Sequence, residues 1–117
     1  MSPAVSVVLP VYNCPEFVGE AIESILHQSC TDFELIVIDD GSKDDTLSVV
    51  RRFDDARIGV FTQENQGLAA TLNRGIRIAR GRYVARQDQD DVSMPERLAR
   101  QVAYLDAHPR CALLGTW

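Results

Sequence analysis

The sequence predicts an α/β fold of the Rossmann-like type, in which a mostly parallel sheet carries helices on both faces. Short β-branched apolar runs alternate along the chain with segments that have helical apolar spacing. The runs are continuously apolar, as expected of strands buried on both faces. Strands that alternate with helices favour parallel pairing through right-handed crossovers. At this length we expect one domain over residues 1–117.

The first half of the chain supplies two strands and two helices. Residues 5–9 form a continuous apolar run, and apolar side chains then recur at helical spacing over residues 18–26. Residues 33–38 are a second apolar run that ends in acidic residues. Ser42 is expected to cap a helix with two aspartates in its first turn, whose inner face ends at Phe53.

The second half continues the alternation. Residues 57–62 predict a third strand and residues 83–85 a fourth. Between them, helical spacing predicts a third helix from Leu68, Leu72, Ile76 and Ala79. Ser93 and Glu96 have the spacing of a capping box, which predicts the start of a fourth helix. Residues 111–114 are expected to begin a fifth strand.

Charge and composition exclude several classes of protein. The chain has 12 basic and 17 acidic side chains, so its net charge of −5 argues against a nucleic-acid partner. It contains no apolar run of the roughly 18 residues that a membrane-spanning helix needs, and its start lacks the basic region of a signal peptide. Its three scattered cysteines suit a reducing compartment. We therefore expect a cytoplasmic protein, with the cytoplasmic face of the membrane as the alternative for a full-length protein.

Acidic residues follow two of the predicted strands, at the sheet edge where open α/β folds bind ligands. They occupy residues 39–40 and 88–91, and Arg86 just before the second group is expected to pair with a nearby carboxylate. Neighbouring carboxylates repel one another unless a cation joins them. A divalent ion held by one or two carboxylates and by substrate phosphates fits this pattern. Because glycine-rich phosphate loops are absent, the sequence predicts a phosphate-bearing ligand bridged by a metal.

Short motifs are spread through the chain in a definite order, at residues 6–13, 39–42, 65–67, 73, 75, 81–83, 88–91, 95–98 and 101. Together they resemble family 2 glycosyltransferases of the GT-A fold, from about Ser6 to the C-terminus. The resemblance implies a hexosyltransferase-type enzyme that moves a sugar from a nucleoside-diphosphate donor, a UDP-sugar first, with inversion at the anomeric carbon. It implies Mn²⁺ or Mg²⁺ as cofactor. The implied acceptor is an unknown saccharide or lipid-linked molecule of cell-surface polysaccharide biosynthesis.

The resemblance also implies roles for single residues. The donor-binding set would be Pro10, Val11, Tyr12, Asn13, Asp40, Asn73, Asp88 and Gln89. Tyr12 should lie against the base, and Asp40 should accept a hydrogen bond from the base or ribose, while Asp39 would only orient the loop. Asp88 should approach the ribose and the metal, and Asp90 should bind the metal directly. Ordinary packing is the alternative for Tyr12, and a solvated helix surface is the alternative for Asn73.

Other parts of the family's chemistry are not expected in this chain. The general base that deprotonates the acceptor should lie beyond Trp117, so the sequence assigns no catalytic residue here. We expect the nucleotide-binding half of a catalytic domain, without its acceptor half and inactive alone. Two alternatives stay open, a non-catalytic nucleotide-binding module and a phosphoacceptor receiver domain. The second would need acids after the first strand and an aspartate after the third, where residues 10–13 and 62–64 supply neither. The sequence predicts no oligomeric state.

Overall fold

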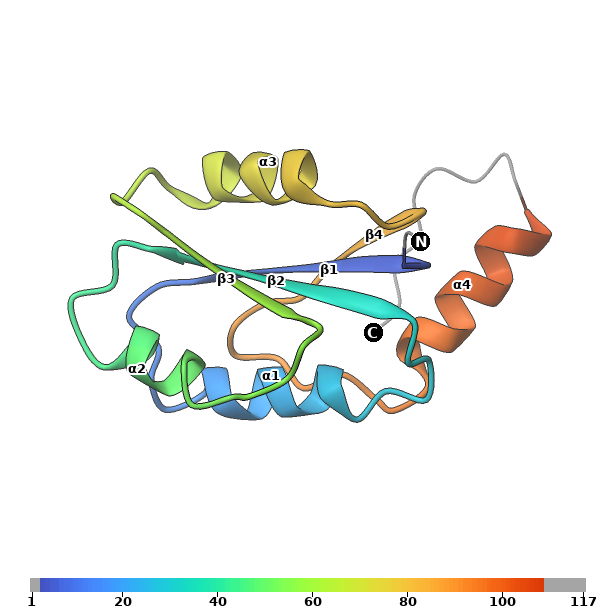
Figure 1. Ribbon diagram of the computed structural model, residues 1–117, viewed down its shortest axis with the longest axis horizontal. Helices are drawn as coiled ribbons and strands as arrows, with labels where there is room; N and C mark the ends of the chain where they lie inside the picture. Colours follow the sequence, from blue (N-terminus) through green and yellow to red (C-terminus); the bar gives the residue numbers. More distant parts are fainter. Residues whose placement is uncertain (1–2, 109–117) are drawn as a thin grey trace.

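The computed structural model describes residues 3–108, which contain four parallel strands and four helices (Figure 1). The strands are β1 (Val5–Val11), β2 (Phe33–Asp40), β3 (Ile58–Gln63) and β4 (Tyr83–Arg86). The helices are α1 (Val18–Leu26), α2 (Thr46–Val50), α3 (Leu68–Ile78) and α4 (Arg97–Ala107). Each predicted element in this part of the chain is present. The fifth strand predicted at residues 111–114 lies outside the described residues.

The strands form one sheet in the order β3-β2-β1-β4. Central β1 pairs in parallel with β2 from Val5↔Phe33 to Val11↔Asp39, and with β4 from Val5↔Tyr83 to Val8↔Arg86. This order matches the first four strands of the doubly wound dinucleotide fold, whereas receiver domains have the order 2-1-3-4-5. The Rossmann-like prediction is confirmed, and the topology argues against the receiver alternative.

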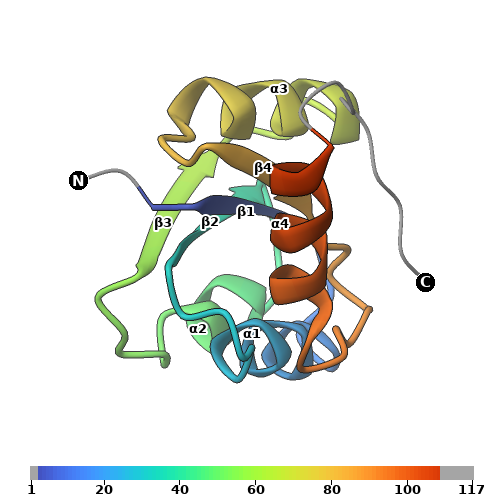
Figure 2. The ribbon, with the colours of Figure 1, turned by 90° about the vertical axis from the view of Figure 1, so that its right-hand side faces the viewer.

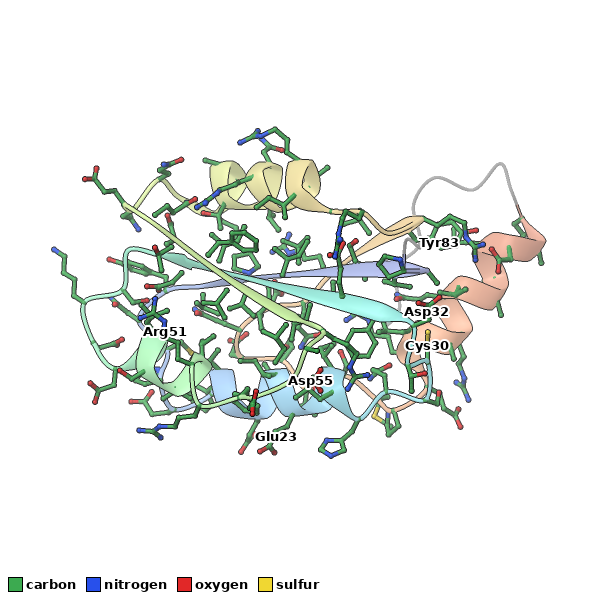
Figure 3. The ribbon with its side chains drawn as sticks, viewed as in Figure 1. Glu23, Cys30, Asp32, Arg51, Asp55 and Tyr83 are labelled. Carbon is green, nitrogen blue, oxygen red and sulfur yellow. The ribbon has the colours of Figure 1, made fainter. Side chains whose placement is uncertain are left out.

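Helices cover both faces of the sheet, with α3 on one side and α1 and α2 on the other (Figures 1 and 2). The main core lies on the α1 side, where alternate residues of β1 and β2 meet the apolar face of α1 (Figure 3). Its fully buried members include Val7, Leu9, Leu35, Val37, Ile22 and Ile25. Leu98 of α4 joins the same core. None of the helices described is long and apolar enough to cross a membrane.

The buried residues of helix α3 are small, and two of the four apolar residues that predicted the helix are exposed. Thr71 and Gly75 are buried, whereas Leu68 and Ile76 are 52% and 54% exposed. Gly75 allows a close approach, because a Cβ atom there would lie 2.4 Å from Cγ1 of Val8. The larger apolar residues consequently lie beside the contact and not in it.

The approach of α3 to β1 predicts opposite effects for two helical glycines. Gly75→Ala should lower the free energy of unfolding by about 1–3 kcal/mol, because the added methyl overpacks the contact with Val8. Gly19→Ala is the matched control, since its methyl would meet Cγ1 of Val49 at an ordinary 3.7 Å. It should stabilise α1 by up to about 1 kcal/mol through helix propensity. Urea denaturation measures both, and equal midpoints would contradict the tight packing of α3.

Two predicted helix caps are wrong, and both serines serve other contacts. Helices α2 and α4 begin after Ser42 and Ser93, at Thr46 and Arg97, with no side-chain cap. The Ser42 hydroxyl accepts a hydrogen bond from the backbone N–H of residue 13, and the Ser93 hydroxyl donates to Oε1 of residue 87. Long-range polar contacts at the sheet edge thus replace the local caps that the spacing suggested.

Candidate functional site

Three loops meet at the carboxyl ends of β1, β2 and β4, on the left of Figure 1. The backbone N–H of Tyr12 donates to Oε1 of Gln89 at 2.6 Å, across 77 residues of sequence. The N–H of Asn13 donates to Oγ of Ser42 at 3.0 Å, and the N–H of Lys43 donates to Oδ1 of Asn13 at 2.9 Å. The structure therefore brings the predicted residues 12, 13 and 89 together with the loop after β2.

The end of β1 divides into buried and accessible residues. Pro10 and Val11 belong to the strand and are buried, whereas Tyr12 is 40% exposed. Asn13 adopts a φ of 47°, in the left-handed region that asparagine tolerates better than most residues. This turn lets its backbone and side chain both contact the loop after β2. Tyr12 and Asn13 are thus the exposed residues of this segment, and the contacts of Asn13 hold the turn against the loop after β2.

Asp40 is the most heavily hydrogen-bonded carboxylate at this edge. Its Oδ1 accepts from Nε2 of Gln63 and the N–H of Gln66, both at 2.8 Å. Its Oδ2 accepts from the N–H of Gly67 at 3.0 Å and Nδ2 of Asn65 at 3.2 Å. Burial opposes ionisation, but these hydrogen bonds outweigh it and lower the pKa of Asp40. Because they fill the four acceptor positions of a carboxylate, Asp40 holds the loop between β3 and α3.

Asp39, by contrast, keeps an acceptor available. Its Oδ1 accepts one long hydrogen bond, from the N–H of Ser42 at 3.3 Å. Its Oδ2 has no hydrogen-bond partner among the described residues, although Asp39 is 4% exposed and is as deeply buried as Asp40. The turn that follows needs Gly41, whose φ is 81° and whose Cβ, if present, would lie 2.7 Å from the backbone nitrogen of Asn65. The hydrogen bond from Ser42 fits the orienting role that the resemblance implies for Asp39, and that role stays a prediction.

The loop after β4 presents the D-x-D carboxylates. Oδ1 of Asp88 accepts from Nε of Arg86 at 3.0 Å, which confirms the predicted pairing of this arginine. Asp90 and Asp91 are exposed, and their carboxylates have no hydrogen-bond partner in residues 3–108. Burial chiefly raises the pKa of the Cys14 thiol, and the charge of Asp90 adds to the effect. Asp90 directly follows Gln89, whose side chain accepts from the backbone N–H of Tyr12, so the loop after β4 lies against the loop after β1.

A polar cluster of Gln87, Ser93 and Arg97 joins the two ends of this loop. Gln87 is 2% exposed, and its Nε2 donates to the carbonyl of Asp91 at 2.7 Å. Its Oε1 accepts from Oγ of Ser93 and from Nη1 of Arg97, the latter at 2.8 Å. Sequence reasoning assigned no role to Arg97. A glutamine at the end of an apolar strand was the available signal that a polar partner lies nearby.

The remaining predicted residues do not join one cluster. Asn73 lies exposed on α3, and its side chain makes no hydrogen bond to another described residue. Over residues 3–108, no three His, Cys, Asp or Glu side chains gather as a metal cage. Two carboxylates, Asp88 and Asp90, fit instead the kind of ion that is shared with substrate phosphates.

The comparisons with known proteins agree with this geometry. The family model described as glycosyl transferase family 2 matches residues 6–117. The chain is 43% identical to EpsE of Bacillus subtilis over 97% of its own length and 42% of that protein. It is 41% identical to the glycosyltransferase GlyG of Streptococcus pneumoniae, over 92% of the chain and 38% of GlyG. The chain thus spans less than half the length of these relatives.

Solved structures show the same arrangement of elements. TarS from S. aureus in complex with UDP-GlcNAc matches with a TM-score of 0.84 and 31% identity, over 93% of this chain and 32% of that one. The mannosyltransferase PcManGT from Pyrobaculum calidifontis, in complex with GDP-Man and Mn²⁺, matches with a TM-score of 0.82 and 31% identity. It covers 90% of this chain and 33% of that one.

Proposed function

Because the chain belongs to glycosyl transferase family 2, we propose that its three-loop edge binds a nucleoside-diphosphate sugar, with a UDP-sugar as first candidate. The observation that carries the proposal is the convergence of Tyr12, Asp39 and Asp90 at the carboxyl ends of β1, β2 and β4. Such a crevice is where open α/β sheets bind nucleotides. The complexes of TarS with UDP and UDP-GlcNAc support uridine as the first candidate, and the complex of PcManGT with GDP-Man makes guanosine the alternative.

The nucleoside would be held by the first two loops. Tyr12, which is exposed after β1, would lie against the base, with Pro10, Val11 and Asn13 shaping the wall behind it. Asp40 would accept the hydrogen bond from the base or ribose, with the unpartnered oxygen of Asp39 beside it as the alternative acceptor. Asp40 also contributes through the loop that it holds.

The diphosphate would be held by the third loop. Asp90, with Asp88, would bind Mn²⁺ or Mg²⁺, which when bound offsets the negative charge that develops on the departing nucleoside diphosphate. Gln89 fixes the loop against the backbone of Tyr12. Contact of Asn73 with the donor stays a prediction.

A second part of the proposal concerns the acceptor of the sugar. We propose that the longer protein transfers the sugar with inversion to a saccharide or lipid-linked acceptor, in the cytoplasm or at the cytoplasmic face of a membrane. Deprotonation of the acceptor hydroxyl is assigned to no residue among 1–117. Transfer by the longer protein would separate this function from that of a non-catalytic nucleotide-binding module.

Nucleotide binding is tested by the melting temperature of the chain. UDP with Mn²⁺ should raise it, because a ligand at 100 times its Kd stabilises the folded state by about 2.7 kcal/mol. EDTA should remove most of the shift, and Mn²⁺ alone should give little. GDP in place of UDP tests the base.

Each other outcome has a distinct meaning. A larger shift with GDP would replace uridine by guanosine in the proposal. A shift with beryllofluoride and Mg²⁺ in the absence of nucleotide would instead support the receiver alternative. No shift with either nucleoside diphosphate would overturn donor binding by this chain.

A further inference from the structure

Arg97 joins the two sides of the loop that carries the D-x-D carboxylates. Its Nη2 donates to the backbone carbonyl of Arg86 at 2.7 Å, before the loop. Its Nη1 donates to Oε1 of Gln87 at 2.8 Å and to Oγ of Ser93 at 3.0 Å, and Ser93 follows the loop. One guanidinium group therefore fixes both ends of the segment over residues 88–92.

The start of α4, which carries Arg97, is held against the end of α1. Oε1 of Gln28 accepts from the backbone N–H of Leu98 at 2.9 Å, and its Nε2 donates to the carbonyl of Met94 at 2.7 Å. The N–H of Ser29 donates to the carbonyl of Pro95 at 2.7 Å. The start of α4 is thus held against the C-terminal end of α1, and Arg97 extends from this fixed base into the loop.

Among residues 3–108, no carboxylate pairs directly with the charge of Arg97. Its three acceptors are uncharged, and the side chain is partly buried. Burial lowers the pKa of Arg97, and the negative charges of Asp88 and Asp91 oppose that effect. A cation beneath neighbouring carboxylates reduces their mutual repulsion and favours their ionised forms. The hydrogen bonds and the positive charge of Arg97 therefore both act on the loop over residues 88–92.

We propose that Arg97 is a positioning residue that holds Asp88 and Asp90 in the arrangement needed to bind a divalent cation together with a nucleoside diphosphate. This inference rests on the proposed function. Arg97 acts from behind the loop, because its hydrogen bonds go to Arg86, Gln87 and Ser93 and not to the open edge. Lysine would be a poor substitute, since only the planar fork of arginine reaches several acceptors in fixed directions.

The experiment compares the Kd of UDP with Mn²⁺ and with EDTA, by NMR titration of the full chain. The ratio of the two values measures the contribution of the metal. Loss of a residue that orients metal ligands typically costs 10–100-fold in metal affinity. Arg97→Met should therefore lower the ratio about 10–100-fold while changing the Kd in EDTA less than about twofold. Arg97→Lys should give an intermediate ratio.

Arg100→Met is the matched control on the same helix. The Arg100 side chain is 77% exposed, and Glu96 is its one ion-pair partner within residues 3–108, so this variant should keep the wild-type ratio. Ser93→Ala removes one hydroxyl from the cluster and should lower the ratio a few-fold, which keeps the test available if Arg97→Met does not fold. Amide exchange over residues 88–92 should also accelerate in Arg97→Met and not in Arg100→Met.

The outcomes separate this inference from the proposed function. A wild-type ratio near one would overturn metal-assisted donor binding and this inference with it. A second outcome would overturn only the role of Arg97. In it, the wild-type ratio is large, Asp90→Ala brings the ratio to one, and folded Arg97→Met keeps the wild-type ratio. Equal weakening of both Kd values in Arg97→Met would also overturn the role of Arg97, because a merely structural role predicts that pattern.

Discussion

The Asp90→Ala chain is expected to bind UDP in the presence of Mn²⁺ with a Kd at least about 100-fold higher than that of the natural chain. A direct metal ligand should cost no less than the upper end of the 10–100-fold loss seen for residues that only orient ligands. The fold should be unaffected, because Asp90 is exposed and its carboxylate makes no hydrogen bond to a described residue. Isothermal titration calorimetry with and without EDTA measures the effect.

Asp91→Ala is the matched control for this prediction. Asp91 is adjacent to Asp90 and exposed, and its carboxylate makes no hydrogen bond to another residue in 3–108. Its replacement by alanine changes the net charge by the same amount as Asp90→Ala. The Kd of Asp91→Ala should stay within a few-fold of the natural value. Equal losses in the two variants would mean that the loop attracts the metal through its total charge, and the assignment of Asp90 as ligand would be wrong.

Asp40→Ala is expected to lower the free energy of unfolding by about 3 kcal/mol. The substitution removes an acceptor of four hydrogen bonds and leaves the backbone N–H groups of Gln66 and Gly67 without it. Buried donors that lose a charged partner cost about 1–3 kcal/mol each, although water entering the loop recovers part of this. Asp39→Ala, which loses a single 3.3 Å hydrogen bond, should cost less than about 1 kcal/mol. Guanidinium denaturation at neutral pH compares the two.

The same carboxylate predicts a pH dependence of stability. The pKa of Asp40 lies below its usual value of 3.8 in the folded chain, so its ionised form favours folding. This contribution is complete above the unfolded pKa of about 3.9 and is lost as the pH falls through the folded value. The stabilities of the natural and Asp40→Ala chains should therefore converge as the pH falls from 5 toward 2. A constant difference over that range would contradict the role of the ionised carboxylate.

The strands and the helices on both faces of the sheet could be predicted because buried segments have a recognisable pattern of apolar residues in the sequence itself. Continuous β-branched runs such as residues 5–9 and 33–38 have few other uses in a chain of this composition. The face of α3 could not be read in the same way. Its buried residues are Thr71 and Gly75, and only the position of Val8 on β1 makes a glycine the better packing residue there.

The place of the candidate site could also be predicted, whereas the partners within it could not. Parallel strands have their carboxyl ends at one edge of the sheet. The acidic residues after the second and fourth predicted strands were therefore expected at the same edge. The difference between Asp39 and Asp40 depends on donors from residues 63–67, more than twenty positions away. Likewise, Ser93 has the spacing of a local cap, but the proximity of Gln87 and Arg97 gives it another use.

The central position of β1 determines when the site can be completed during synthesis. β1 is made first and meets β2 early, but its other neighbour, β4, follows some forty residues after β2 ends. At 5–20 residues per second, roughly 2–9 s separate the two pairings on the ribosome. Tyr12 and Asp39 are therefore synthesised several seconds before Asp90, and the edge that their loops share with the loop after β4 forms only when β4 pairs with β1.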